Sequence, residues 1–254
     1  MKKNKKMLLQ CVLCLTILFC MSQILPIINF YEPSEINITT NVIENITLQE
    51  QIYSVLPSCV YIEAKVIYEG WNGESITSIR SGSGVIVSKD GLIVTAGHMV
   101  DRAIKITVRL NDGREFEAVE WQKENYTDLG LIKIDSNNLP TVLLGDSDNE
   151  FLGNQVFIIG CPFGKQLYNT VTTGIVSGLK RDIDLFGEKL LIQVDSQAWP
   201  GNSGGGLFNS NGELIGVLVG AMSGYDGISV CIPGNIVKLM LDKYNSEQDI
   251  VKAQ

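Results

Sequence analysis

The sequence predicts an all-β fold made of many short antiparallel strands. Short runs rich in β-branched and aromatic residues recur along the chain, separated by turn signatures such as Asp112-Gly113 and Asn211-Gly212. This regular spacing is typical of a sandwich or a barrel. The runs fall into two sets, which predicts two lobes: residues 60–67, 84–88, 92–95, 104–110, 116–121 and 129–134 in the first, and residues 155–159, 171–178, 190–194, 206–209, 214–219 and 227–232 in the second.

The first 30 residues predict a membrane anchor. Residues 1–6 contain four lysines, and residues 7–30 contain no charged side chain. A helix of about 20 apolar residues spans a bilayer, and lysines before it are expected to stay in the cytoplasm. The rest of the chain would then be the extracytoplasmic part of a single-pass membrane protein. A cleaved secretory signal is the alternative, but no Ala-x-Ala-like site is found, which favours the uncleaved anchor.

Helices are expected only near the two ends of the remaining chain. Residues 31–46 are polar and typical of a stalk. Thr47-Leu48-Gln49-Glu50 matches a capping box, which predicts a short helix packed on the first lobe. Asn235 is expected to cap a last helix over residues 236–243, followed by a tail over residues 243–254.

Charge and cysteine content exclude several classes of partner. The formal net charge is −8, and this value already includes the four lysines before the anchor, so the rest of the chain is more acidic still. Nucleic acid is therefore not expected as a partner. Only Cys59, Cys161 and Cys231 lie outside the apolar segment, so at most one internal disulfide can form. With no Cys-x-x-Cys pair among these three cysteines and a single histidine in the chain, no metal site is expected. No cofactor is expected either.

Nucleophilic chemistry is indicated by a glycine-rich stretch around Ser203. Glycines on both sides of a serine allow a sharp turn that exposes the hydroxyl and aims neighbouring N–H groups at one point. In Gly201-Asn202-Ser203, the N–H groups of Gly201 and Ser203 are the expected oxyanion donors, with Asn202 between them. A serine nucleophile needs a base, and the only histidine of the chain is His98. Asp128 follows it, which completes the order His, Asp, Ser of one known catalytic triad.

Each of these residues also has a simpler interpretation. A lone histidine near an apolar strand is often structural, aspartate is common at strand ends, and glycine-rich stretches form turns. The order of His98, Asp128 and Ser203 along the chain favours the catalytic interpretation for all three.

Five ordered blocks of the sequence resemble one protein family: Ser81-Gly82-Ser83-Gly84-Val85-Ile86-Val87, Thr95-Ala96-Gly97-His98, Thr127-Asp128-Leu129, Thr172-Thr173-Gly174-Ile175-Val176-Ser177 and Gly201-Asn202-Ser203-Gly204-Gly205. Together they resemble the trypsin-like serine proteases of the HtrA (Deg) family. The resemblance implies a protease domain over residues 47–242 with two six-stranded antiparallel β-barrels, at about residues 57–140 and 141–233. Many HtrA proteases carry PDZ domains after the protease, and no such domain is expected in the short tail of this sequence.

The resemblance also implies a function and a substrate site. It implies a serine endopeptidase that cleaves unfolded or extended polypeptides in quality control or the stress response, and it allows a homotrimer. A substrate would pair as a strand along residues 217–220. No acidic residue lies in the implied pocket walls, so small or medium apolar residues such as valine, alanine or leucine are expected before the cut. The alternatives are a catalytically silent or partner-dependent membrane-tethered peptide-binding module and an active protease that cuts one specific partner. The residues implied to contact substrate are Gln197, Ala198, Trp199, Val217, Leu218, Val219, Gly220, Ser229 and Cys231.

Overall fold

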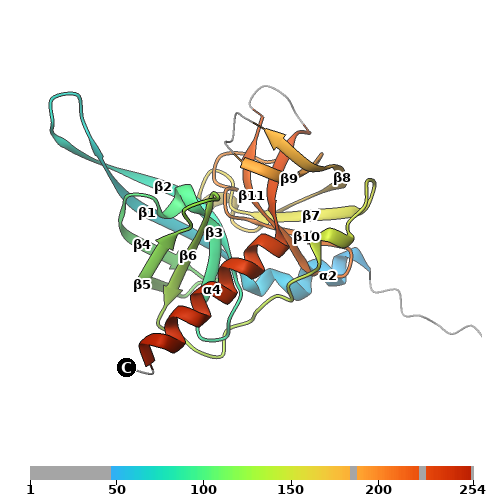
Figure 1. Cartoon of the computed structure of the whole chain (residues 1–254), viewed down its shortest axis with the longest axis horizontal. Coiled ribbons are helices and arrows are strands. Elements are labelled where there is room, and N and C mark those ends of the chain that lie inside the picture. Colours follow the sequence, from blue (N-terminus) through green and yellow to red (C-terminus); the bar gives the residue numbers. More distant parts are fainter. Residues whose placement is uncertain (1–46, 184–187, 223–226, 253–254) are drawn as a thin grey trace, which may run out of the picture. The chain divides into compact units, whose positions relative to one another are not determined.

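Antiparallel strands close into two six-stranded barrels in the computed structural model of the chain, which describes residues 47–183, 188–222 and 227–252 (Figure 1). The strand order is β1-β2-β3-β6-β5-β4 in the first barrel and β10-β11-β12-β9-β8-β7 in the second. This confirms the predicted all-β fold of two barrels. The strands are β1 (Cys59–Glu69), β2 (Ser75–Ile86), β3 (Leu92–Ala96), β4 (Ala103–Arg109), β5 (Glu115–Lys123), β6 (Leu129–Ile134), β7 (Gln155–Gly160), β8 (Thr170–Ile183), β9 (Glu188–Val194), β10 (Gly206–Asn209), β11 (Leu214–Ala221) and β12 (Ser229–Pro233).

The predicted basic segment, membrane anchor and stalk, at residues 1–6, 7–30 and 31–46, lie outside the described residues. Within the described part of the chain, no helix has both the length and the apolar character needed to cross a membrane.

Buried apolar side chains of the strands fill the barrels. In β1 the side chains of Ile62, Ala64 and Val66 are fully buried, as expected for the inward face of a strand with a period of two residues. In the second barrel Phe157 and Phe208 stack with ring centroids 5.2 Å apart. Both rings belong to the same hydrophobic cluster as the buried strands of the first barrel, so the core is continuous between the barrels.

The hairpin of β1 and β2 is longer than the sequence predicts. The strand expected at residues 84–88 begins at Ser75, and the hairpin pairs from Cys59 with Val85 out to Glu69 with Ser75. Figure 1 shows this hairpin extending beyond the rest of its barrel. Residues 75–79 of β2 are all exposed, so they lack the buried face whose alternation signals a strand in the sequence.

The N-terminal helix forms as its capping box predicts, but its position differs from the expectation. Helix α2 (Leu48–Val55) is capped by Thr47, whose N–H donates to Glu50 Oε2 at 2.7 Å. A Cβ atom built on Gly212 would lie 2.7 Å from Gln51 Oε1, so the turn between β10 and β11 lies directly against this helix. The helix therefore does not pack on the first lobe alone.

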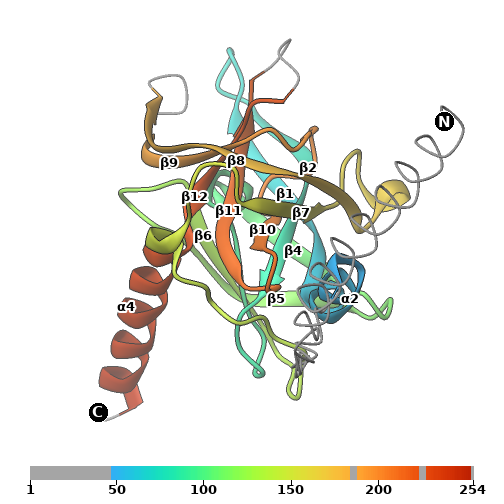
Figure 2. The same cartoon turned by 90° about the vertical axis from the view of Figure 1, so that its right-hand side faces the viewer.

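The C-terminal helix is also longer than predicted. Helix α4 (Gly234–Lys252) includes most of the segment 243–254 that the sequence analysis assigns to a tail. Its apolar stripe continues to Tyr244, which is nearly buried and donates a hydrogen bond to Glu120 at 3.4 Å. Lys243 pairs with Glu124 at 3.3 Å. These contacts with β5 and the residue after it connect α4 to the first barrel, and Figure 2 shows its whole length.

Candidate active site

The first barrel brings His98 and Asp128 into direct contact. His98 lies in the single turn α3 (Gly97–Val100), which follows β3, and Asp128 immediately precedes β6. These two strands are paired, with Ala96 opposite Leu129. The residues next to this pair therefore meet, and His98 Nδ1 lies 2.6 Å from Asp128 Oδ2.

Main-chain contacts fix the orientation of this pair. The N–H of His98 donates to Asp128 Oδ1 at 2.7 Å, and the N–H of Gly97 donates to the Asp128 carbonyl at 2.7 Å. A Cβ atom on Gly97 would lie 2.8 Å from the Leu129 carbonyl oxygen, so only glycine allows this approach. Since Nδ1 faces the carboxylate, Nε2 is the ring nitrogen left to meet other groups.

Ser203 lies on a tight loop between β9 and β10. Gly201 and Gly204 on either side of it have φ angles of +103° and +86°, which favour glycine. The loop is closed by hydrogen bonds from the Asn202 N–H to the Trp199 carbonyl and from the Gly205 N–H to the Asn202 carbonyl. The glycines that flank Ser203 in the sequence therefore form the sharp turn that the sequence predicts.

The loop of Ser203 lies against the segment that carries His98. The Ser203 carbonyl accepts a hydrogen bond from the N–H of Ser83 in β2 at 2.8 Å. A Cβ atom on Gly204 would lie 3.0 Å from the N atom of Ala96, two residues before His98. The structure therefore places all three predicted catalytic residues at the junction between the two barrels.

The carbonyl groups of Pro200 and Gly201 point toward neighbouring segments of the protein. The Pro200 carbonyl accepts from the Phe163 N–H at 2.8 Å, and the Gly201 carbonyl accepts from Ser83 Oγ at 2.8 Å. In a trans peptide the C=O and N–H groups point in opposite directions, so the Gly201 N–H is directed away from Phe163. Neither the Gly201 N–H nor the Ser203 N–H has an acceptor among the described residues.

The open edge of β11 begins after Leu218. The Leu218 N–H donates to the Gly205 carbonyl at 2.9 Å, and its carbonyl accepts from the Gly204 N–H at 2.7 Å. Farther along, Gly220 and Ala221 pair with β12 on one side, and no described strand pairs with them on the other. The sequence predicts that the substrate strand begins at residue 217. In the structure, the edge at residues 217 and 218 already pairs with residues 204–206 of the protein itself.

The residues predicted to contact substrate differ in their exposure. Ser229 is buried and donates from its hydroxyl to the Ser196 carbonyl at 2.7 Å. Trp199 is 38% exposed beside the loop of Ser203. Val217, Leu218, Val219, Ser229 and Cys231 are buried, Ala198 and Gly220 are partly buried, and Gln197 and Trp199 are exposed.

Two polar residues at the junction are not predicted as site residues from the sequence. Arg80 donates to the carbonyl of His98 and to the hydroxyl of Tyr68. Ser83 contacts the carbonyls on both sides of Asn202. Ser83 belongs to the Ser-Gly-Ser-Gly block that carries the family resemblance, whereas no local pattern marks Arg80.

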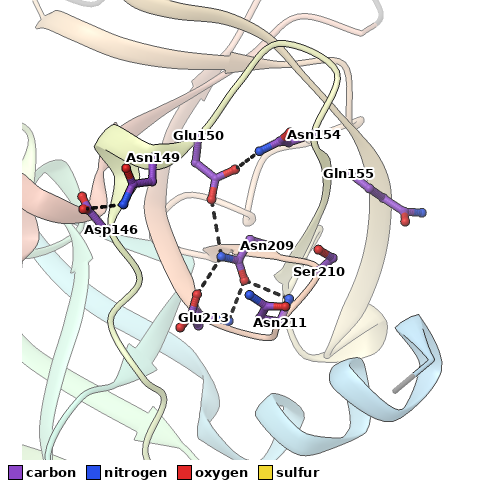
Figure 3. Close-up of a pocket in the computed structure, with 9 residues that line it drawn as sticks. All are labelled: Asp146, Asn149, Glu150, Asn154, Gln155, Asn209, Ser210, Asn211 and Glu213. Carbon is purple, nitrogen blue, oxygen red and sulfur yellow. Dashed lines mark hydrogen bonds between the residues drawn. The ribbon is translucent and has the colours of Figure 1, made fainter. Parts of the chain in front are cut away.

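A polar pocket lies at the turn between β10 and β11, away from this site (Figure 3). Its volume is about 460 Å³. Glu150 is nearly buried there and accepts from the side-chain amides of Asn154, at 2.8 Å, and Asn209, at 3.4 Å. No group of three His, Cys, Asp or Glu side chains among the described residues is arranged to bind a metal. The pocket is lined by Asp146, Asn149, Glu150, Asn154, Gln155, Asn209, Ser210, Asn211 and Glu213.

Comparisons with known proteins identify the family. Residues 82–217 match the sequence profile of the family described as Trypsin-like peptidase domain. The chain is 40% identical over 184 residues to a probable periplasmic serine endoprotease DegP-like from Halomonas elongata, covering 71% of this chain and 38% of that protein. A DegP-like relative from Chlamydia trachomatis is 39% identical over 175 residues, covering 67% of this chain and 35% of the relative. The chain thus spans less than two fifths of the length of these curated relatives.

Solved structures give the same result. A variant of the HtrA-type protease AlgW with a decapeptide superposes with a TM-score of 0.71 at 30% sequence identity, covering 80% of this chain and 67% of that chain. AlgW with a tripeptide gives a TM-score of 0.67 at 33% identity, covering 77% and 62% of the two chains. The chain therefore belongs to the trypsin-like peptidase family and contains a serine protease domain of the HtrA type.

Proposed function

We propose that the chain is a serine endopeptidase in which Ser203 is the nucleophile, His98 the general base and Asp128 the residue that orients the base. The contact of 2.6 Å between His98 and Asp128, next to the loop of Ser203, is the observation that carries this proposal. In this role Asp128 keeps the proton of the neutral imidazole on Nδ1 and stabilises the charged imidazolium that forms during the reaction.

The reaction proceeds by acyl transfer. Ser203 Oγ attacks a peptide carbonyl while its proton passes to His98 Nε2, and the N–H groups of Gly201 and Ser203 stabilise the resulting oxyanion. The imidazolium then protonates the leaving amine, which leaves an acyl-enzyme. Water, deprotonated by His98, attacks this ester and releases the second product with Ser203 regenerated.

Substrate binding uses the open edge of β11. An extended peptide can add as a strand next to Val219, Gly220 and Ala221, because no described strand pairs with this edge beyond the contacts of Leu218. This position is shifted toward the C-terminal end of β11 relative to the one the sequence predicts. Main-chain pairing of this kind depends little on sequence but requires an extended chain, so unfolded polypeptides are the proposed substrates.

The pocket for the residue before the cut is proposed to accept small apolar side chains. Its implied walls include Gln197, Ala198, Val219 and Ser229, and none of these carries a negative charge. A lysine or arginine there would be left without a buried counter-charge, which is strongly unfavourable. Valine, alanine and leucine are the proposed preferences.

The cellular setting is proposed from the sequence and from relatives. Residues 7–30 would anchor the chain in a membrane, with residues 1–6 in the cytoplasm and the protease domain outside it. The curated relatives named above are described as periplasmic, which supports the extracytoplasmic placement. Quality control of unfolded proteins is the proposed role, and a homotrimer is the assembly to test.

Labelling and cleavage test this proposal directly. The full chain and its Ser203→Ala variant are purified in mild detergent and incubated with a fluorophosphonate probe, and separately with an unfolded and a folded protein. The unmutated chain is expected to label on Ser203 and to cut the unfolded protein after small apolar residues. Ser203→Ala is expected to do neither. Peptide binding without labelling would instead indicate a catalytically silent binding module, and labelling without cleavage would indicate a protease that depends on a partner.

A further inference from the structure

A buried serine of the first barrel connects the loop of Ser203 to both barrels. Ser83 lies in β2 and is only 2% exposed. Its N–H donates to the Ser203 carbonyl at 2.8 Å, and its hydroxyl donates to the Gly201 carbonyl at 2.8 Å. The same hydroxyl accepts from the Cys161 N–H at 2.9 Å, and the Ser83 carbonyl accepts from the Thr95 hydroxyl at 2.7 Å.

These contacts determine how the loop presents its N–H groups. The Gly201 N–H belongs to the peptide whose carbonyl, on Pro200, is bound by the N–H of Phe163. Phe163 is two residues from Cys161, which is itself bound to the Ser83 hydroxyl. The hydroxyl thus contacts the loop directly at Gly201 and indirectly through the segment of residues 161–163.

The Ser83 main chain acts next to the other donor, the Ser203 N–H. Binding of the Ser203 carbonyl by the Ser83 N–H fixes the peptide that follows the nucleophile. The Ser203 N–H belongs to the preceding peptide, whose Asn202 carbonyl accepts from the Gly205 N–H. Oxyanion donors are effective because they are aimed before the reaction begins and need no reorganisation during it. A residue that fixes the carbonyls of this loop is therefore expected to act on the rate of the chemical step rather than on substrate affinity.

We propose that Ser83 is a positioning residue, whose hydroxyl joins Gly201 to the segment of residues 161–163 and so keeps the oxyanion N–H groups of the loop aligned. The proposal rests on the proposed function of Ser203, because alignment has a catalytic effect only if the loop stabilises an oxyanion. The hydrogen bonds themselves belong to the structure whether or not the chain is active.

The main test compares Ser83→Ala with a matched control. Ser83→Ala removes the hydroxyl that contacts Gly201 and Cys161 but keeps the main-chain contacts of Ser83. Ser58→Ala makes the same change at a fully buried serine whose hydroxyl has no partner among the described residues. In the full chain, kcat of Ser83→Ala is expected to fall roughly 10- to 100-fold with KM within about twofold, less than the loss for a deleted oxyanion donor. Ser58→Ala is expected to stay within about twofold of the unmutated chain.

Rescue and hydrogen exchange separate alignment from stability. Ser83→Thr keeps a hydroxyl and is expected to recover most of the lost kcat. In Ser83→Ala, the amides of residues 199–206 are expected to exchange with solvent at least about tenfold faster, and in Ser58→Ala they are expected to exchange at the original rate. If Ser83→Ala does not fold, Ser83→Cys, with its weak donor, is compared with Ser83→Thr in the same assays.

The outcomes distinguish this proposal from the proposed function. Equal kcat and equal exchange in Ser83→Ala and Ser58→Ala, or in Ser83→Cys and Ser83→Thr, would overturn the role of Ser83. Suppose instead that the loop exchanges faster in Ser83→Ala while the unmutated chain neither labels nor cleaves. This result would support Ser83 as the residue that orders the loop and would contradict the protease function.

Discussion

Asp128 contacts His98 with both carboxylate oxygens, accepting from the main-chain N–H with Oδ1 and lying 2.6 Å from Nδ1 with Oδ2. The first contact needs an acceptor for the main-chain N–H of His98, and the second needs an acceptor for the proton on Nδ1. An aspartate satisfies both, and an asparagine can satisfy only one. The proposed role of Asp128 can therefore be tested apart from its structural contact.

Asp128→Asn is expected to keep the fold and lose the activity. The new amide can still accept from the His98 N–H, but its NH₂ group then faces Nδ1 and favours the tautomer with its proton on Nε2. That tautomer cannot accept the proton of Ser203, so kcat is expected to fall about 10⁴-fold. Thermal denaturation should give a melting temperature close to that of the unmutated chain. A fall of less than about tenfold in a folded variant would contradict the orienting role.

Arg80 is expected to support the position of His98 from the β1–β2 hairpin. Its guanidinium donates to the His98 carbonyl and lies over the ring of Tyr68, 5.9 Å from the centroid. Hydrogen bonds from a charged donor contribute about 1.5–3 kcal/mol. Arg80→Ala is therefore expected to lower kcat/KM roughly tenfold and also to reduce the melting temperature.

Tyr68→Phe is the control for this contact, because it removes the hydroxyl that Arg80 also binds and keeps the ring beneath the guanidinium. It is expected to change kcat/KM by less than about threefold, since the hydrogen bond to His98 remains. A larger effect for Tyr68→Phe than for Arg80→Ala would show that the bond to the His98 carbonyl does not matter for activity.

Gly204→Ala is expected to disrupt the loop of Ser203. Gly204 has a φ angle of +86°, and a Cβ atom there would lie 2.1 Å from the Ser83 carbonyl oxygen. Gly153→Ala is the matched control, because Gly153 has a φ angle of +88° and a Cβ atom there would meet nothing within 4 Å. The control is expected to lose about 1–2 kcal/mol of stability from backbone strain alone.

Urea denaturation and fluorophosphonate labelling measure the difference between these two variants. Gly204→Ala is expected to lose more stability than Gly153→Ala and to label at less than about 1% of the original rate, since the loop cannot keep its place next to Ser83 and Thr95. Equal losses of stability and normal labelling in both variants would show that the loop can relax around the added methyl group.

The sequence predicts the strands and the candidate catalytic residues because both leave local signals. Short runs of β-branched and aromatic residues between turn signatures mark the strands, and His98, Asp128 and Ser203 are chemically distinctive residues in distinctive surroundings. Arg80 has no such signal, since its role depends on a main-chain carbonyl brought next to it by the fold. Ser83 lies in the Ser-Gly-Ser-Gly block that carries the family resemblance, but the block does not predict the contacts of its hydroxyl with Gly201 and Cys161.

Contacts between distant segments also explain the errors in element boundaries. The apolar stripe of α4 needs the first barrel as a partner beyond residue 243, and the sequence does not show that Glu120 and Glu124 lie beside it. The outer half of β2 has no buried face at all and forms through its pairing with β1. Both features depend on which segments the fold brings together.

The buried thiol of Cys231 is expected to lower stability in alkaline solution. Burial raises its pKa well above the ordinary value of 9.0, so the folded protein keeps the proton that the unfolded chain releases. The unfolded state then binds fewer protons, and the free energy of unfolding falls as pH rises above about 9, by about 1.4 kcal/mol per pH unit for one thiol. Below that pH the thiol is neutral in both states and has no such effect.

Cys231→Ala is expected to remove this part of the pH dependence, and Val230→Ala, at a neighbouring buried position without a proton to lose, is the control. Both variants should be less stable than the unmutated chain at pH 8 because both leave a cavity. The partly buried Tyr168 and the other groups with a raised pKa remain in both variants, so the difference between the two slopes isolates the thiol. Urea denaturation from pH 8 to pH 11 under reducing conditions gives these slopes. Parallel curves for the two variants would mean that the Cys231 thiol ionises in the folded protein as readily as in the unfolded chain.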